Sequence, residues 1–265
     1  MKIFVCIKQV PGVSEVKIDP KTNTLIREGI PSIMNPMDRN SMQLALDIKK
    51  ERDAEIIALS MGPPQAEAVL REALSMGADK AYLLTDRAFA GADTLATSHT
   101  LSLAIKKILE GDQDYLVICG TQAIDGDTAQ VGPEIAEELN IPQITYVQKF
   151  KFKDKNTITV ERVFRTEEIV IIDTKLPALI SVLKELNDPQ YPSMIGVVKA
   201  YEKEIIYLNA EDLKADKANI GLTGSQTEVW KIFIPERKGE HKILEGKIED
   251  VTNELCQNLR EDNIF

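Results

Sequence analysis

Short apolar segments alternate with helical patterns through the first 140 residues of this 265-residue chain. Four segments have the near-continuous apolar composition of buried strands: Lys2–Ile7, Glu55–Ser60, Lys80–Leu84 and Tyr115–Cys119. Apolar residues at helical spacing occupy four others: Ser41–Lys50, Gln65–Met76, Thr94–Leu109 and Pro133–Leu139. Apolar strands that alternate with helices are typical of a parallel sheet covered on both faces. We therefore predict a three-layer α/β fold whose sheet is mostly parallel.

The pattern changes after Pro142. Four strand-like segments follow one another without intervening helices: Gln143–Phe152, Thr157–Val163, Glu168–Ile172 and Leu176–Val182. They predict an antiparallel extension of the same sheet instead of a second domain. The segment Leu186–Tyr201, which contains two prolines and a glycine, is predicted to be a loop.

The chain beyond residue 219 is polar and ends in an amphipathic helical pattern at Lys247–Leu259. We predict a main domain over residues 1–219 and a C-terminal arm over residues 220–265 that packs on a partner subunit. The periodicity is equally compatible with a helix that packs on its own domain.

Composition argues against several classes of protein. The chain has 32 Lys and Arg residues against 42 Asp and Glu residues, whereas binding to a nucleic-acid backbone needs clustered cations. Two histidines and three widely spaced cysteines argue against a histidine triad or a metal site. No apolar run approaches the roughly 18 residues of a membrane-spanning helix, and the first residues do not resemble a signal peptide. We expect a cytoplasmic protein that does not bind nucleic acid and does not insert into a membrane.

Ligands of open parallel sheets bind beyond the carboxyl ends of the strands, where helix N-termini point. The loop at 33–38 has Asn35 followed by Pro36, an ordinary start for a helix. The loop at 60–64 combines Gly62 with two prolines. Taken alone, both loops are explained as a helix cap and a tight turn.

The loop at 89–98 places small residues and hydroxyls around a predicted helix start. Asp93 can cap this helix, and the hydroxyls of Thr94, Thr97 and Ser98 surround its first turn. Such residues leave room for a phosphate, which free amides and the helix dipole favour. A cap would need only Asp93 and would leave these hydroxyls unexplained. A phosphate site and a simple cap are therefore equally supported.

The loop at 120–133 follows an apolar strand directly and is too long for a minimal turn. Its three glycines and polar groups suit an adenine, a ribose and a diphosphate. We expect the amides of 127–131 to donate to phosphate. Carboxylates repel phosphates, so Asp125 and Asp127 are expected to cap the helix or to accept from ribose hydroxyls or amides. The helix starts either at Asp127 or near Gly132.

The chain lacks a GxGxxG after its first strand and a GxxxxGK[ST] motif, so it carries neither the usual dinucleotide fingerprint nor a P-loop. Six other segments are distinctive: KIFVCIKQVP, IMNPMD, ALSMGPPQAEAVLREALSMGADKA, GTQAIDGDTAQVGPEIAEEL, KLPALISV and LNDPQYPSMIGVVKA. In this order they resemble the small (beta) subunit of electron-transfer flavoproteins over nearly the whole chain. The resemblance implies that residues 1–219 bind an adenine nucleotide or flavin at the loops described above. With the loop at 89–98 included, the expected contacts are Cys6, Asn35, Pro36, Met37, Asp38, Met61, Asp93, Thr94, Thr97, Gly120, Thr121, Gln122, Ala123, Ile124, Asp125, Gly126, Asp127, Thr128, Ala129, Gln130 and Val131.

Members of this family hold either AMP or a second FAD in the beta-subunit site. The segment Asp86–Ser98 resembles the electron-bifurcating type, which holds FAD, and its hydroxyls and helix start suit the additional phosphate. The resemblance then implies that this FAD takes a hydride from NADH. One electron would pass to the FAD of the alpha subunit and on to an acyl-CoA dehydrogenase-type partner, and the other to ferredoxin or flavodoxin. Two alternatives stay open: a non-bifurcating carrier with structural AMP, and a nucleotide-sensing regulatory module without a redox role.

The resemblance also assigns the remaining surfaces. Leu186–Gly196 corresponds to the family's recognition loop for the dehydrogenase, with Met194 as its apolar anchor. The arm over residues 220–265 would grip the alpha subunit. Because the flavin supplies the chemistry, no catalytic side chain and no metal ligand are expected.

Overall fold

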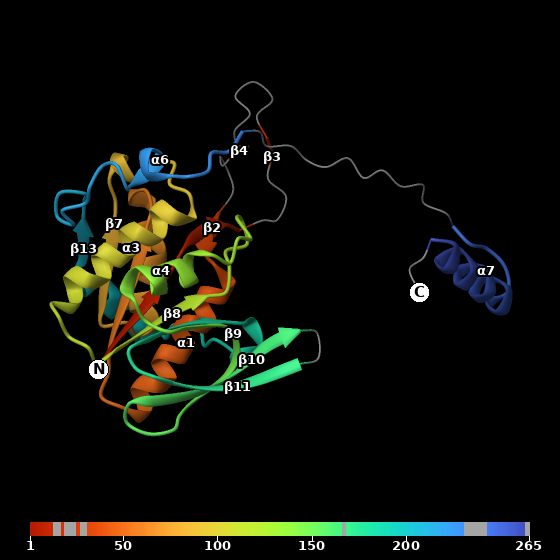
Figure 1. Ribbon diagram of the computed structural model, residues 1–265, viewed down its shortest axis with the longest axis horizontal. Coiled ribbons are helices and arrows are strands. Elements are labelled where there is room, and N and C mark those ends of the chain that lie inside the picture. Colours follow the sequence, from red (N-terminus) through yellow and green to blue (C-terminus); the bar gives the residue numbers. More distant parts are fainter. Residues whose placement is uncertain (13–16, 19–24, 27–30, 166–167, 231–242, 263–265) are drawn as a thin grey trace. The chain divides into compact units, whose positions relative to one another are not determined.

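The computed structural model describes residues 1–12, 17–18, 25–26, 31–165, 168–230 and 243–262. The chain divides into two compact units, Met1–Trp230 and Lys231–Phe265, which are described separately. In the first unit, helices lie on both sides of one large sheet (Figure 1). The strands are β1 (Lys2–Cys6), β2 (Gln9–Pro11), β3 (Lys17–Ile18), β4 (Leu25–Ile26), β5 (Ser32–Met34), β6 (Glu55–Met61), β7 (Lys80–Leu84), β8 (Tyr115–Gly120), β9 (Gln143–Phe152), β10 (Thr157–Arg165), β11 (Glu168–Lys175), β12 (Ala178–Val182) and β13 (Ile205–Leu208). The helices are α1 (Pro36–Glu51), η1 (Pro64–Ala66), α2 (Glu67–Met76), η2 (Arg87–Phe89), α3 (Thr94–Leu109), α4 (Val131–Leu139), η3 (Lys184–Leu186), α5 (Met194–Glu202), α6 (Gly221–Gly224) and, in the second unit, α7 (Ile248–Glu261).

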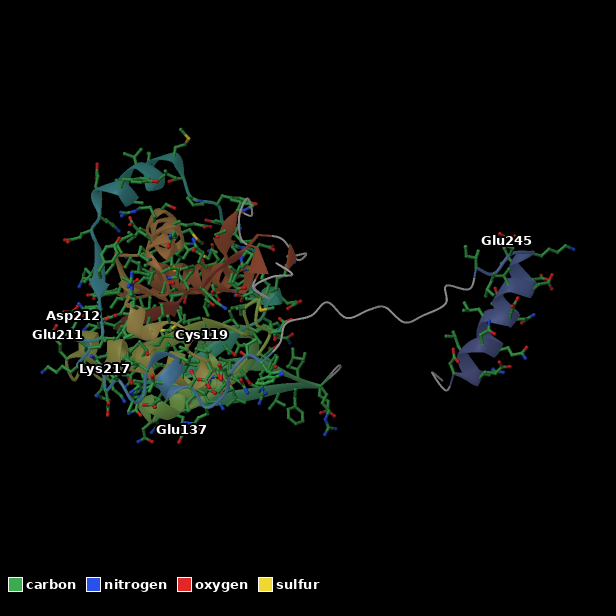
Figure 2. The ribbon with its side chains drawn as sticks, turned by 90° about the horizontal axis from the view of Figure 1, so that it is seen from above. Cys119, Glu137, Glu211, Asp212, Lys217 and Glu245 are labelled. Atoms are coloured by element: carbon green, nitrogen blue, oxygen red, sulfur yellow. The ribbon has the colours of Figure 1, made fainter. Side chains whose placement is uncertain are left out.

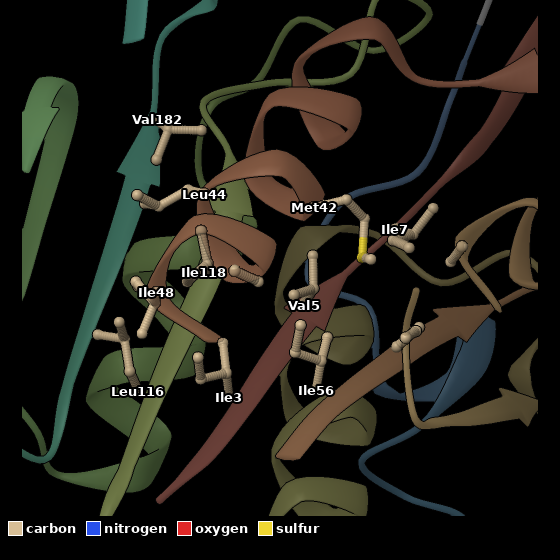
Figure 3. Close-up of a cluster of buried hydrophobic side chains, with 14 of the residues drawn as sticks. Ile3, Val5, Ile7, Met42, Leu44, Ile48, Ile56, Leu116, Ile118 and Val182 are labelled. Carbon is tan, nitrogen blue, oxygen red and sulfur yellow. The ribbon is translucent and has the colours of Figure 1, made fainter. Parts of the chain in front are cut away.

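Nine strands form the sheet in the order β11-β10-β9-β12-β8-β1-β6-β7-β13. From β9 to β13 all neighbours are parallel, which confirms the predicted α/β class. Successive side chains of β1 enter opposite layers: Ile3 and Val5 pack with α1 and α2, whereas Phe4 packs with α3 and α4. Figure 3 shows the first of these layers, where α1 lies over β1, β6 and β8.

The predicted antiparallel extension is confirmed for β10 and β11, which pair antiparallel to each other, with β10 antiparallel to β9. It is wrong for β12, which lies between β8 and β9 and runs parallel to both. All five residues of β12 are buried, and four of them are apolar, so the strand needs cover on both faces, which the interior of the sheet provides.

The segment predicted to be a loop at Leu186–Tyr201 contains a helix, α5. The Ser193 side chain caps it by accepting a hydrogen bond from the Gly196 amide at 3.0 Å. The sequence signal for this helix is Ser193, a residue type favoured at helix N-caps, directly before a run of mostly apolar residues.

The first unit ends at Trp230 and not at residue 219, so the predicted domain boundary lies too early. Ile220 is buried, and the amide of Leu222 donates to the Ala90 carbonyl at 3.0 Å. Residues 220–230 therefore pack on the rest of the first unit. The amphipathic pattern near the C-terminus does form a helix, α7, in which no residue is buried. Among the described residues, no helix is long and apolar enough to cross a membrane.

Candidate nucleotide-binding crevice

The order of the strands reverses at β1. After β1 the chain adds β6 and β7 on one side and then crosses back to add β8 on the other. Ligands of open α/β sheets bind at such a switch point, beyond the carboxyl ends of the strands. Here β1 ends at Cys6 and β8 ends at Gly120, so the loops after Cys6 and Gly120 form the walls of the candidate crevice.

Asn35 connects the loop before α1 to the loop after β8. It occupies the N-cap position of α1, as predicted, but its side chain does not cap the helix. Its Nδ2 donates to the Gln122 carbonyl at 2.9 Å, and its Oδ1 accepts from the Ile124 amide at 3.2 Å. The interpretation of this loop as a plain cap is therefore wrong, because the Asn35 amide group is used to fix the neighbouring loop.

Asp38 is buried in the first turn of α1 and connects three segments. Its carboxylate accepts from the Lys8 amide at 2.7 Å and from Asn35 Nδ2 at 3.0 Å, and also from the Gly120 amide. Burial raises the pKa of Asp38 to about 7, although these hydrogen bonds oppose the rise. The contact also explains Gly120, because a Cβ atom there would lie 2.3 Å from Asp38 Oδ1.

The loop after β8 is held at its base and open along its far half. The Thr121 amide and hydroxyl both donate to the Val182 carbonyl, at 3.0 and 2.8 Å. Asp125 accepts from Lys8 Nζ at 2.7 Å, and Asp127 accepts from Gln122 Nε2 at 2.7 Å. Neither aspartate caps α4, so the expectation that they cap this helix is wrong. The alternative role, accepting from ribose hydroxyls or amides, stays a prediction.

The start of α4 leaves a run of open donors. The helix begins at Val131, so of the two predicted starting points the one near Gly132 is correct and the one at Asp127 is wrong. Among the residues that the structure describes, the backbone amides of 128–132 donate no hydrogen bond within the chain. The Asp127 amide, which was also predicted to be a phosphate donor, is instead bound to the Ala123 carbonyl at 2.9 Å. Five consecutive open amides at a helix N-terminus are suited to an anion.

The start of α3 lies against the start of α4. The Asp93 carboxylate caps α3 through the Ala96 amide at 3.0 Å, as predicted. The Thr94 hydroxyl lies 3.3 Å from Gln130 Oε1 and 3.1 Å from Glu134 Oε1. The two helix N-termini are therefore adjacent at one side of the crevice.

Two other hydroxyls of the first turn of α3 differ in their availability. Ser98 is buried and donates to the Leu95 carbonyl at 2.8 Å, so it is not available to a ligand, contrary to expectation. Thr97 is half-buried, and within the described part of the chain its hydroxyl makes no hydrogen bond.

Cys6 and Cys119 are direct neighbours on β1 and β8. A hydrogen bond with Cys6, together with burial, raises the pKa of the Cys119 thiol well above its ordinary value. Cys119 lies inside the first unit, whereas Glu137 is on the outer surface of α4 (Figure 2). Both thiols therefore lie near the carboxyl ends of the two strands that border the switch point. Met61, the expected contact on β6, lies on the side of β1 opposite β8.

Two residues of the crevice were not predicted from the sequence. Lys8 follows β1 by two residues and joins both Asp38 and Asp125. Glu134 lies between the two helix starts, and its Oε2 atom is buried without a hydrogen-bond partner among the described residues. The signal for Lys8 was available, since a cation directly after the first strand faces the switch point.

The fit of a nucleotide to this crevice is favourable. Open amides are available for phosphate, and a Cβ atom at Gly126 would meet no other atom within 4 Å, so the loop leaves free space beside these amides. The fold and the crevice define the chain as an α/β protein with a nucleotide site at the switch point of its sheet.

Comparisons with known proteins agree with this class. Residues 22–213 match the electron transfer flavoprotein domain. The chain is 50% identical to the electron transfer flavoprotein subunit beta of Thermoanaerobacterium thermosaccharolyticum, with all of both chains covered. It is 49% identical to the caffeyl-CoA reductase-Etf complex subunit CarD of Acetobacterium woodii, again over both whole chains. It is 41% identical to the acryloyl-CoA reductase electron transfer subunit gamma of Anaerotignum propionicum, covering 97% of this chain and 98% of that one.

The chain therefore belongs to the electron transfer flavoprotein family, as a beta subunit.

Proposed function

We propose that the crevice holds FAD, with its diphosphate at the paired N-termini of α3 and α4. The observation that carries this proposal is the contact of Thr94 with Gln130 and Glu134, which brings a second helix start beside the five open amides. AMP has one phosphate and needs one such helix start, whereas FAD has two phosphates. The Thr97 hydroxyl, on the same turn of α3, adds a further polar contact.

When bound, FAD would supply the redox chemistry of this proposal, which is acceptance of a hydride from NADH and transfer of single electrons to the FAD of the alpha subunit and to ferredoxin or flavodoxin. The residues of the chain bind and orient the cofactor. Lys8 and Asn35 fix the loop at 120–131, and the amides of 128–132 bind phosphate. The Cys6 and Cys119 thiols lie near the carboxyl ends of the two strands that border the switch point.

The exposed segment Tyr191–Ile195, here called the docking loop, is proposed to bind an acyl-CoA dehydrogenase-type flavoenzyme. Tyr191 and Met194 are 90% and 88% exposed, an unusual exposure for large apolar side chains. Two relatives are named as components of coenzyme A-thioester reductase systems, which supports this class of partner.

The arm is proposed to bind the alpha subunit through α7. Ile248 and Leu255 are exposed on this amphipathic helix, which buries no residue of its own. An amphipathic helix with exposed apolar residues is suited to a groove on another chain.

The function is tested by a coupled assay on the purified complex with its dehydrogenase partner. We expect NADH to reduce ferredoxin only when the acyl-CoA acceptor is also present, because the two electrons leave by separate routes. Reduction of the dehydrogenase by NADH without any dependence on ferredoxin would contradict bifurcation. A single chain that binds ATP and no flavin would instead indicate a sensing module.

A further inference from the structure

Asn40 of α1 connects the helix to the base of the docking loop. It is only 2% exposed. Its Nδ2 lies 3.1 Å from the Lys184 carbonyl and 2.8 and 3.0 Å from the carbonyl and Oδ1 of Asn187. Asn187 returns the contact, since its Nδ2 donates to the Asn40 carbonyl at 3.1 Å. A buried amide that meets three acceptors across 147 positions of sequence is a specific tether.

A second tether lies one turn further along α1. The Gln43 side chain is buried, and its Oε1 accepts from the Gln190 amide at 2.9 Å. Gln190 is the residue immediately before the docking loop. The N-terminal side of the loop is therefore held by two consecutive turns of α1.

The C-terminal side of the docking loop is held by α2. A Cβ atom at Gly196 would lie 2.4 Å from the Ser75 carbonyl, so α5 and α2 are in close contact. Arg71 Nη1 donates to the carbonyls of Ala200 and Lys203, both at 2.7 Å. A cavity of about 220 Å³, lined by residues of α1, α2 and the loop, lies between these two attachments. The docking loop is thus an exposed apolar bulge fixed at both ends.

The same helix builds the crevice. Asn35 and Asp38 hold the loop after β8 and the ends of β1 and β8, and Asn40 follows two residues later. The first two turns of α1 therefore contact the crevice on one side and the segment that leads into the docking loop on the other. Both sites take their positions from one short rigid element.

We propose that Asn40 is a positioning residue for electron transfer, which holds the docking loop in the conformation that the partner flavoenzyme binds. This rests on the proposed docking role of Met194 and its neighbours. A loop that is fixed before binding loses less conformational entropy when its partner docks. Loss of the tether therefore weakens docking while the crevice, held by Asn35 and Asp38, keeps its cofactor.

The test uses the complete complex with its alpha subunit and the dehydrogenase. Asn40→Ala and Asn187→Ala each remove part of the tether, and the double variant removes all of its side-chain hydrogen bonds. Ser41→Ala is the matched control, because Ser41 is the adjacent buried residue of α1 and its hydroxyl donates only to the Met37 carbonyl. Met194→Ala serves as the reference for docking itself. Two quantities are measured: KM and kcat with respect to the dehydrogenase, and hydrogen exchange of the amides in residues 186–193.

We expect Asn40→Ala to raise KM for the dehydrogenase roughly five- to tenfold, with kcat and flavin content unchanged. The double variant should raise KM further than either single variant, because each single variant keeps part of the tether. Asn187→Ala keeps the bonds of Asn40 Nδ2 to the backbone carbonyls of Lys184 and Asn187, and Asn40→Ala keeps the bond of Asn187 Nδ2 to the Asn40 carbonyl. Exchange in residues 186–193 should accelerate while exchange in α1 and in the Ser41→Ala variant does not.

An unchanged KM in Asn40→Ala, together with a raised KM in Met194→Ala, overturns the positioning role and leaves the docking proposal intact. An unchanged KM in both variants overturns the docking proposal and the inference with it. Equal acceleration of exchange in α1 and in the loop shows a general loss of structure and also overturns the positioning role.

Discussion

A buried carboxyl group, that of Asp38, joins three segments at the mouth of the crevice. It accepts backbone hydrogen bonds from the loop after β1 and from the end of β8, while it belongs to the first turn of α1. The same contact requires glycine at position 120, because a Cβ atom there would overlap the Asp38 carboxylate. The local geometry of the site therefore depends on the close approach of this carboxylate to Gly120.

Asp38→Asn should change the pH dependence of stability. Burial raises the pKa of Asp38 in the folded chain from 3.8 to about 7. Between these values the folded chain keeps a proton that the unfolded chain has released, so the free energy of unfolding falls as pH rises. The expected slope for one proton is about 1.4 kcal/mol per pH unit. The variant lacks this contribution, so urea unfolding across this range should show the wild type losing stability relative to the variant. If the stabilities of the wild type and the variant change with pH in parallel, the raised pKa of Asp38 is refuted.

Gly120→Ala should destabilise the chain by about 1–3 kcal/mol, because the new methyl group overlaps the Asp38 carboxylate and Met37. Gly126→Ala is the matched control in the same loop, since its new methyl group meets nothing within 4 Å. Urea unfolding of both variants measures the difference. Equal stability of the two variants would show that the contact at Gly120 is relieved at no cost.

At the scale of elements, local signals predicted the starts of α1 and α3, because proline at the first helical position and a capping aspartate act within a few residues. They did not predict where β12 lies, since its neighbours β8 and β9 are chosen by packing across the whole sheet. The structure brings two of the loops singled out in the sequence, at 33–38 and 120–133, together through Asn35, and their role as a binding site stays a prediction. The individual bonds of Asn35 and Asp125 were not predictable, because each partner comes from a different loop.

Asp93→Ala tests the start of α3. The Asp93 carboxylate caps the helix and also accepts from the amides of Gln226 and Thr227. Its loss should lower stability by about 1–2 kcal/mol and speed hydrogen exchange in residues 225–228. Thr97→Ala, on the same turn, should do neither. Unchanged exchange near Thr227 in Asp93→Ala would show that α3 does not hold this segment.

At the scale of the whole molecule, the chain consists of a packed unit that ends at Trp230 and a second unit that contains α7. The first unit contains both hydrophobic layers, the crevice and the docking loop. α7 buries none of its residues. The division separates the part proposed to bind the cofactor from the part proposed to bind the alpha subunit.

Truncation after Trp230 should therefore leave the first unit folded, with an unfolding midpoint close to that of the full chain. Association with the alpha subunit should fall sharply, because the exposed apolar side chains of α7 are removed. Size-exclusion chromatography of the two chains together measures association, and thermal unfolding of the truncated chain alone is the control. A stable heterodimer without residues 231–265 would contradict the role of the arm.

If the paired helix starts beside the β1–β8 switch point hold the diphosphate of FAD, the purified heterodimer must contain FAD in both of its subunits. The bound nucleotides are released by denaturation, separated by chromatography and counted. We expect two FAD and no AMP per heterodimer. One FAD and one AMP would contradict the proposed site.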